Sequence, residues 1–403
     1  MKFIRKAIKF LIKNKEYYKN AIIPLFIYAL EVLTGGISAL IISISHRYLV
    51  ALLILPQLIT LRGDIAGVYS AHISTGLNTG KIKLGFKNNT EIFYSIIFGT
   101  LIIALVFRLI VAIFWGLIYV SMKIFIIALF IVLMSYVINV FISVILTAWF
   151  AFIATKKALN PDLILYPLAS VINDFIVATT LYITVLTIEV FSTESIEVCT
   201  ILLTFLVFII LLGLYLNLDI KLNISLKIIR ESFISILVGF IFSTINSSIL
   251  SNSIEKFKQE PSFAILWPIL ISALGGQASA ISCFYTTQLY MGYIKEIKEF
   301  FKEFGKNLIS SYFFSLLLAG IFYATLATII ALSFNRYFLI LMITLLTILT
   351  SFTMILLIAL LISSITFSFG LDPDNFTIPL ITSISDFLVT AILVEFIMLF
   401  FLE

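Results

Sequence analysis

Two aspartates lie deep inside long apolar segments of this chain, and their type and spacing suit cation binding. Asp174 and Asp386 are 212 residues apart, and each follows another aspartate, Asp162 or Asp374, by twelve residues. Twelve residues of helix span ~18 Å, about half of a ~30 Å hydrocarbon core. A carboxylate at that depth costs on the order of 2.5–3.5 kcal/mol to insert, so its presence favours a functional role. The alternative is a carboxyl group that is protonated or hydrogen-bonded within a helix bundle.

These aspartates belong to one of two motifs that occur twice. NPDLILYPLASVINDFIVA at 160–178 matches DPDNFTIPLITSISDFLVT at 372–390, with eight of 19 positions identical. PQLITLRGDIAGVYSAHISTGLNTG at 56–80 matches PILISALGGQASAISCFYTTQLYMG at 268–292, with nine of 25 identical. Six of the eight prolines pair at the same gapless offset: Pro56 with Pro268, Pro161 with Pro373, and Pro167 with Pro379. The chain is therefore interpreted as two copies of one unit.

Two carboxylates that face each other repel, and a hard dication between them removes the repulsion. Nearby polar residues such as Asn173 offer oxygen atoms, and no histidine or cysteine cluster accompanies them in the sequence. Oxygen-only sites favour Mg²⁺ or Ca²⁺ over Zn²⁺ or Cu⁺, and Mn²⁺ or Co²⁺ is a further option. We therefore predict that Asp174 and Asp386 bind a divalent cation at mid-membrane. Asp162 and Asp374 are expected to attract cations at the inner mouth, together with Asp372.

The other motif adds small and polar residues to the candidate site. Gly275 and Gly276 precede Gln277 in the second copy, and Asp64 lies in the first copy. Glycines let helix backbones approach closely, or leave carbonyl groups facing a water-filled path. Asp64 and Gln277 align only after a shift of one residue, and both are candidate ligands. We expect Arg62 to neutralise Asp64, because isolated charges are unfavourable inside a membrane.

Composition defines the class of protein. The chain has 403 residues, of which 62% are hydrophobic and 12% charged, a balance that soluble domains do not have. Apolar runs of 18 or more residues recur, which is typical of transmembrane helices. We predict spans at roughly 21–43, 48–80, 92–120, 124–154, 163–191, 198–218, 231–252, 262–292, 306–333, 338–369 and 375–401. The second span of each half contains proline and glycine, so we expect it to be broken or kinked.

Positive charge predicts the orientation. With the N-terminus inside, predicted inner segments hold 19 of the 26 Lys and Arg residues. Residues 1–20 resemble a basic amphipathic helix on the cytoplasmic leaflet. Six spans separate the starts of the two copies, so the copies are parallel, related by a pseudo-twofold axis along the membrane normal. The predicted fold is an all-α polytopic membrane protein with two five-helix repeats, at 21–192 and 231–403, and a linking helix and basic loop at 193–230.

Two further intramembrane acids, Glu31 and Glu395, have no acidic counterpart at the repeat offset. Glu395 follows Asp386 by nine residues, which is half a turn out of phase. We therefore expect Glu395 to face away from the site and interpret it as a neutralised packing residue. For Glu31, two interpretations remain open: a group that binds a proton or a coupling ion, and a packing residue.

At these motifs the sequence resembles the MgtE family of magnesium channels and the related solute carrier family 41. The Gly-Gly-Gln-Ala-Ser run at 275–279 is similar to Gly-Gly-Asn-Ala-Gly of MgtE, and Arg-Gly-Asp…Ser-Thr at 62–75 resembles the carrier branch. The Asp-Pro…Pro…Thr…Asp pattern at 372–386 resembles the fifth membrane helix of MgtE, whose last Asp lines the pore. The resemblance implies that Asp386, and through the repeat Asp174, line an ion pathway. MgtE chains carry one five-helix unit and cytoplasmic sensing domains, whereas this chain has two units and no such domains, so gating by them does not carry over.

We therefore expect a transporter of divalent cations, with Mg²⁺ as the main transported ion and no organic cofactor. The sequence has no zinc-binding His-Glu motif, nucleophile elbow or phosphate loop, so we expect no enzymatic activity. One chain is expected to form a pseudo-dimer in the plasma membrane, in contact with lipid and not with nucleic acid. Regulation by a soluble domain would need a separate chain. The alternative is a secondary transporter of another solute, such as an organic cation or a Na⁺-coupled substrate.

Overall fold

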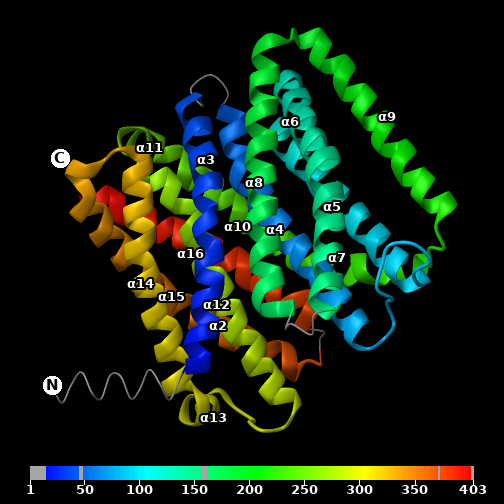
Figure 1. Ribbon diagram of the computed structural model, residues 1–403. Helices are drawn as coiled ribbons and strands as arrows, with labels where there is room; N and C mark the ends of the chain where they lie inside the picture. Colours follow the sequence, from blue (N-terminus) through cyan, green and yellow to red (C-terminus); the bar gives the residue numbers. More distant parts are fainter. Residues whose placement is uncertain (1–14, 45–48, 157–160, 371–372, 401–403) are drawn as a thin grey trace.

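The protein is a bundle of long helices (Figure 1). The computed structural model describes residues 15–44, 49–156, 161–370 and 373–400. Eleven helical segments in this part are long and apolar enough to cross a membrane, which confirms the predicted all-α polytopic fold. The largest differences from the predicted limits are at the first and seventh spans. These helices begin at Lys15 and Leu222, since polar residues at their N-terminal ends continue the helix.

The first half and the linking span contain α2 (Lys15–Tyr28), η1 (Ala29–Glu31), α3 (Val32–Ile44), α4 (Leu49–Asn78), α5 (Glu91–Ile118), α6 (Met122–Ser135), η2 (Tyr136–Val140), α7 (Phe141–Lys156), α8 (Pro161–Val190) and α9 (Thr193–Asn217). The second half contains α10 (Leu222–Asn252), α11 (Ile254–Gln259), α12 (Pro261–Tyr290), α13 (Ile297–Phe300), η3 (Phe301–Gly305), α14 (Lys306–Ala331), η4 (Phe334–Arg336), α15 (Tyr337–Ser368) and α16 (Pro373–Phe400). The predicted helix starts at the Asn-Pro-Asp and Asp-Pro-Asp motifs are confirmed, because α8 and α16 begin at their prolines.

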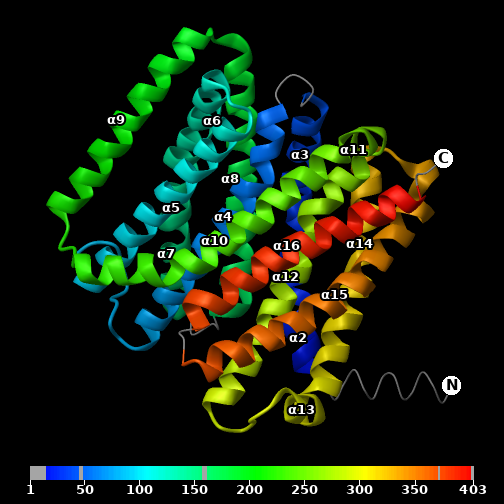
Figure 2. The same ribbon diagram turned by 180° about the vertical axis from the view of Figure 1, so that it is seen from behind.

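The first helix of each half packs against the other half. Helices α2 and α3 pack on α14 and α12, and α10 correspondingly packs on α5 and α4. Individual contacts repeat at the same offset. Gly35 approaches the backbone of Ile265. Ser247 is the repeat counterpart of Gly35, and Leu53 is that of Ile265. The Ser247 hydroxyl donates to the Leu53 carbonyl at 2.6 Å. This mirrored packing supports the predicted pseudo-twofold relation between the halves. Figure 2 shows α10, α16 and α15 side by side on one face.

The second span of each half ends in the same way. Gly80 and Gly292, a repeat-related pair, both have φ near +70°, at +69° and +72°. Glycine adopts this left-handed conformation without the steric cost that a side chain adds. The backbone therefore ends α4 and α12 at equivalent places and turns into the next loop.

The second span of each half is predicted to be broken or kinked; the predicted break is wrong, and the kink stays a prediction. Helices α4 and α12 are each continuous over 30 residues, although Pro56 and Pro268 lie inside them. Interruptions occur elsewhere: the 3-10 turn η1 divides the first span, and the π-helical turn η2 divides the fourth. Neighbouring helices can support a proline-containing membrane helix, so proline alone does not break it. The amphipathic helix predicted for 1–20 lies mostly outside the described residues, and from Lys15 onward the chain belongs to α2.

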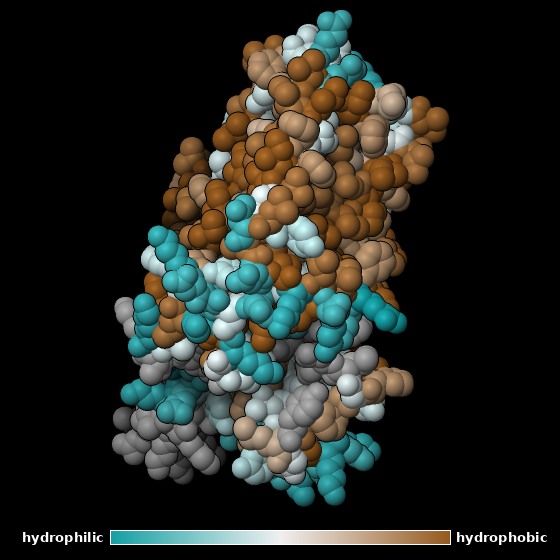
Figure 3. All heavy atoms as spheres, turned by 90° about the vertical axis from the view of Figure 1, so that its right-hand side faces the viewer, coloured by the Kyte–Doolittle hydropathy of each residue, from teal (hydrophilic) through white to brown (hydrophobic). Residues whose placement is uncertain are grey.

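The surface fits a membrane environment. Figure 3 shows a broad hydrophobic region on one side of the molecule, with hydrophilic residues gathered below it and at its upper edge. Helix α9 lies at the periphery, where it packs mainly on α6 (Figures 1 and 2), and most of its apolar side chains are exposed. This placement suits the predicted linking helix. The domain boundaries themselves remain a prediction.

Candidate cation site

Asp174 forms a buried ion pair with an arginine of another helix. The Arg62 Nη2 atom of α4 lies 2.6 Å from the Asp174 Oδ1 atom of α8, and both side chains are at most 7% exposed. Arg62 also contacts the hydroxyl and carbonyl oxygens of Ser170, at 3.4–3.5 Å. The prediction that Arg62 neutralises Asp64 is therefore wrong, because Arg62 forms its ion pair with Asp174. Residues two positions apart on a helix do not face each other, so Arg62 and Asp64 point to different neighbours.

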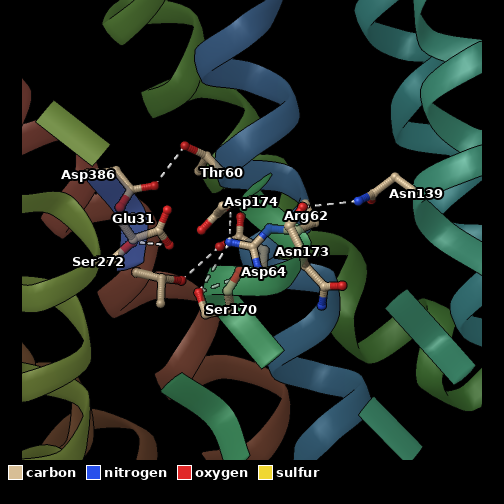
Figure 4. Close-up of polar contacts among 11 residues, drawn as sticks. Glu31, Thr60, Arg62, Asp64, Asn139, Ser170, Asn173, Asp174, Ser272 and Asp386 are labelled. Carbon is tan, nitrogen blue, oxygen red and sulfur yellow. Dashed lines mark hydrogen bonds and ion pairs between the residues drawn. The ribbon is translucent and has the colours of Figure 1, made fainter. Parts of the chain in front are cut away.

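The carboxylate of Asp386, the repeat counterpart of Asp174, has a single hydroxyl as its hydrogen-bond partner among the described residues. Thr60 of α4 donates to Asp386 Oδ2 at 2.8 Å (Figure 4). Ser272, the repeat counterpart of Thr60, donates instead to Glu31 Oε1 at 3.2 Å. The two aspartates thus share a position in the repeat but not a partner, because Arg62 occupies the Asp174 side.

Both aspartates line one internal cavity between the halves, which lies among α2, α4, α8, α12 and α16. The cavity is lined by four repeat-related pairs: Ile59 and Ile271, Gly63 and Gly275, Ser170 and Thr382, and Asp174 and Asp386. It has about 30 Å³ of room for the centre of a water molecule. That volume suits roughly two waters or an ion that has lost most of its hydration shell. The cavity therefore coincides with the expected pseudo-twofold axis.

The glycines of the other motif shape this cavity. A Cβ atom on Gly275 would lie 2.5 Å from the Ser385 hydroxyl, and one on Gly276 would lie 2.0 Å from the Tyr28 hydroxyl. Both glycines line the cavity, as does Gly63, at which an added Cβ would meet no atom within 4 Å. A side chain at 275 or 276 would therefore have to displace the side chain of Ser385 or Tyr28.

Two more buried carboxylates lie close to the cavity. Asp64 Oδ1 accepts hydrogen bonds from Thr382 and Ser383 of α16, at 2.9 and 2.8 Å. Glu31, which is completely buried in the η1 turn, lies next to Asp174 and interacts with it (Figure 4). The interruption of the first span thus places Glu31 beside the site. Sequence reasoning left Glu31 open, and it missed the matched hydroxyl pair Thr60 and Ser272, although both residues lie inside the repeated motif.

Two predicted ligands lie elsewhere. Gln277 Nε2 donates to the Ala21 carbonyl of α2 at 2.9 Å, and Gln277 does not line the cavity. Asn173 is buried, and its side chain points away from the carboxylates (Figure 4). Its backbone carbonyl accepts a hydrogen bond from Asn139 Nδ2 at 3.2 Å. Helix geometry explains both corrections, because the residue beside a cavity-facing one is rotated about 100° around the axis. Asp162 and Asp374 lie in the first turns of α8 and α16, but their side chains, like all of Asp372, lie outside the described residues.

The carboxylates do not form a ready-made coordination shell. Across the described ranges, no three His, Cys, Asp or Glu side chains are clustered closely enough to hold a metal ion. Four acidic side chains, of Glu31, Asp64, Asp174 and Asp386, nevertheless interact electrostatically with Arg62, so acidic groups outnumber basic ones around it. Oxygen ligands that are spread apart suit a hard cation that keeps some of its own water.

The fold and this site define a polytopic membrane protein with a charged internal cavity between duplicated halves. The model of the MgtE family, described as a divalent cation transporter, matches residues 55–185 and 267–396. The matched stretches together cover more than half of the chain, and they begin 212 residues apart, which is the offset of the repeat. The chain therefore belongs to the MgtE divalent cation transporter family, whose members are transporters and not enzymes. No curated protein and no solved structure matched the chain.

Proposed function

We propose that this protein moves divalent cations, chiefly Mg²⁺, across the cell membrane along a pathway between its two halves. Asp174 and Asp386 are the groups that meet the ion at mid-membrane, and Asp64 contributes negative charge beside them. The observation that carries the proposal is that the two repeat-related aspartates line one buried cavity in a chain of this family. Mn²⁺ and Co²⁺ are proposed as further substrates, because the cavity offers oxygen ligands.

The size of the cavity argues against the alternative of an organic cation. About 30 Å³ of room suits an ion with few waters, whereas small-molecule sites usually have volumes of a few hundred Å³. We propose that Asp162 and Asp374 attract cations at the inner mouth, with the N-terminus cytoplasmic in the plasma membrane. One chain is proposed to suffice as a pseudo-dimer, with any soluble regulator supplied as a separate chain.

Ion flux into liposomes tests the proposal. Asp386→Asn keeps the shape of the side chain but removes its charge, and we expect Mg²⁺ flux to fall by at least about tenfold, or ~1.4 kcal/mol in barrier height. Glu395→Gln is the matched control, because Glu395 lies on the same helix and is exposed. Its flux should equal that of the wild type. Full Mg²⁺ transport by either Asp174→Asn or Asp386→Asn would overturn the proposal.

A further inference from the structure

We propose that Arg62 is a tethered cation that holds the Asp174 side of the cavity until a transported ion displaces it. This inference rests on the proposed function and adds a specific competitor to it. Arg62 and Asp174 both line the cavity that Asp386 also lines. An ion that binds between the two aspartates therefore meets a guanidinium already in contact with one of them.

The contacts of Arg62 are those of a replaceable group. Its ion pair with Asp174 is short, but Asp174 Oδ1 has no well-aligned hydrogen bond in the part of the chain that the structure describes. The contacts to Ser170 are long, at 3.4–3.5 Å, and Arg62 Nε is buried with no hydrogen-bond partner among the described residues. A guanidinium has five N–H donors, and a purely structural arginine is usually held by most of them. Arg62 is held chiefly by charge.

A displaced guanidinium would find unused acceptor atoms on its other side. There Arg62 lines a second, smaller cavity, whose volume of about 10 Å³ holds roughly one water molecule, so the guanidinium would enter it by displacing that water and moving the lining side chains. Tyr69 and Asn139 also line this cavity, and both the Tyr69 hydroxyl and Asn139 Oδ1 are buried without a described hydrogen-bond partner. These oxygens are acceptors for the released N–H groups. Arg108 lines the same cavity, so repulsion between the two guanidiniums favours the return of Arg62 to Asp174 once the ion leaves.

The second half has no such group. The repeat counterpart of Arg62 is Leu274, and Asp386 accepts a hydrogen bond from the neutral Thr60 hydroxyl. Before an ion arrives, a guanidinium therefore offsets negative charge on the Asp174 side, where Glu31 also lies, while the described residues form no ion pair with Asp386. A dication in the cavity is attracted by Asp386 and repelled by Arg62, so Arg62 weakens ion binding and speeds ion release.

The test replaces Arg62 by leucine, the residue at the matching position of the other half. In Arg62→Leu we expect the half-saturating Mg²⁺ concentration for liposome flux to fall by at least about tenfold, and the maximal flux to fall as well. The Mg²⁺ concentration that half-protects the purified protein against thermal unfolding should shift in the same direction. Arg62→Lys keeps the charge and should shift both readouts much less. Glu395→Gln should shift neither.

If the leucine variant does not fold, Arg62→Gln serves as a second charge-removing variant. The glutamine amide can still donate a hydrogen bond to Asp174. The proposed role of Arg62 as a displaceable cation would be overturned if folded charge-removing variants had an unchanged or a higher half-saturating Mg²⁺ concentration. Uniform destabilisation at every Mg²⁺ concentration would overturn it too, because that is the signature of a structural arginine. A wild type without any Mg²⁺, Mn²⁺ or Co²⁺ response would instead reject the proposed function, and the inference with it.

Discussion

The two halves of the molecule share a scaffold but differ in charge. In the first half, Glu31, Arg62, Asp64 and Asp174 are all buried around the cavity. The matching positions in the second half hold Ser243, Leu274, Gly276 and Asp386. Only the aspartate of the fifth helix is common to both. The duplication therefore preserved the backbone and one carboxylate per half, while the remaining charges belong to the first half alone.

Under the proposed function, this difference separates the features that an ion pathway would need in both halves from those that it would need in one. The matched features are the glycine and aspartate pairs that line the cavity, Gly63 with Gly275 and Asp174 with Asp386. The unmatched features are buried charges, which under the proposed function alter the strength of ion binding. Because intramembrane charges are costly, a role in transport would account for their confinement to one half.

The largest expected effect on stability comes from replacing Asp174, and it is compared with the same replacement at Asp386. Asp174→Asn leaves the Arg62 guanidinium buried without its counter-charge, so we expect a loss of about 3–5 kcal/mol in unfolding free energy. Asp386→Asn alters a hydrogen bond to a hydroxyl, and we expect a loss of only about 1 kcal/mol. Thermal unfolding of the purified protein in detergent measures both.

A double variant serves as the control for this comparison. Adding Arg62→Leu to Asp174→Asn removes the unpaired charge and should restore most of the lost stability. Equal destabilisation by the two single asparagine variants would show that the ion pair does not distinguish the halves.

The glycine pair tests the shape of the cavity at a smaller scale. At Gly275 an added methyl group would meet the Ser385 hydroxyl at 2.5 Å, whereas at Gly63 it would meet no atom within 4 Å. We expect Gly275→Ala to cost about 1–3 kcal/mol in unfolding free energy by overpacking, with reduced Mg²⁺ flux. Gly63→Ala should cost less than about 1 kcal/mol. The reverse order in thermal unfolding would mean that the halves pack differently from the description above.

At Gln277 we expect the smallest effect on transport. Its side chain donates to the Ala21 carbonyl and lies outside the cavity, so Gln277→Ala should cost about 1 kcal/mol in unfolding free energy. The half-saturating Mg²⁺ concentration in the flux assay should stay at the wild-type value. A shift of that concentration would place Gln277 in the pathway after all, as the sequence alone had suggested.

Much of the molecule is readable from the sequence, because span number, duplication and depth are properties of position along the chain. The runs of apolar residues predict eleven spans, and the offset of 212 predicts which helices correspond. The twelve-residue spacing predicts that Asp174 and Asp386 lie deep in their helices. None of these inferences requires knowing which side chains meet.

Contacts between distant helices were decided only by the tertiary structure. Arg62 pairs with Asp174 and not with Asp64, Gln277 faces α2, and the η1 turn places Glu31 beside the site. Each outcome depends on how helices that are far apart in sequence are rotated and packed against one another. A repeat fixes equivalent positions in its two copies, but a side chain's partner is set by its rotation about the helix axis and by the helix across from it. The sequence therefore determined the paired aspartates, and the fold determined which of them carries a resident positive charge.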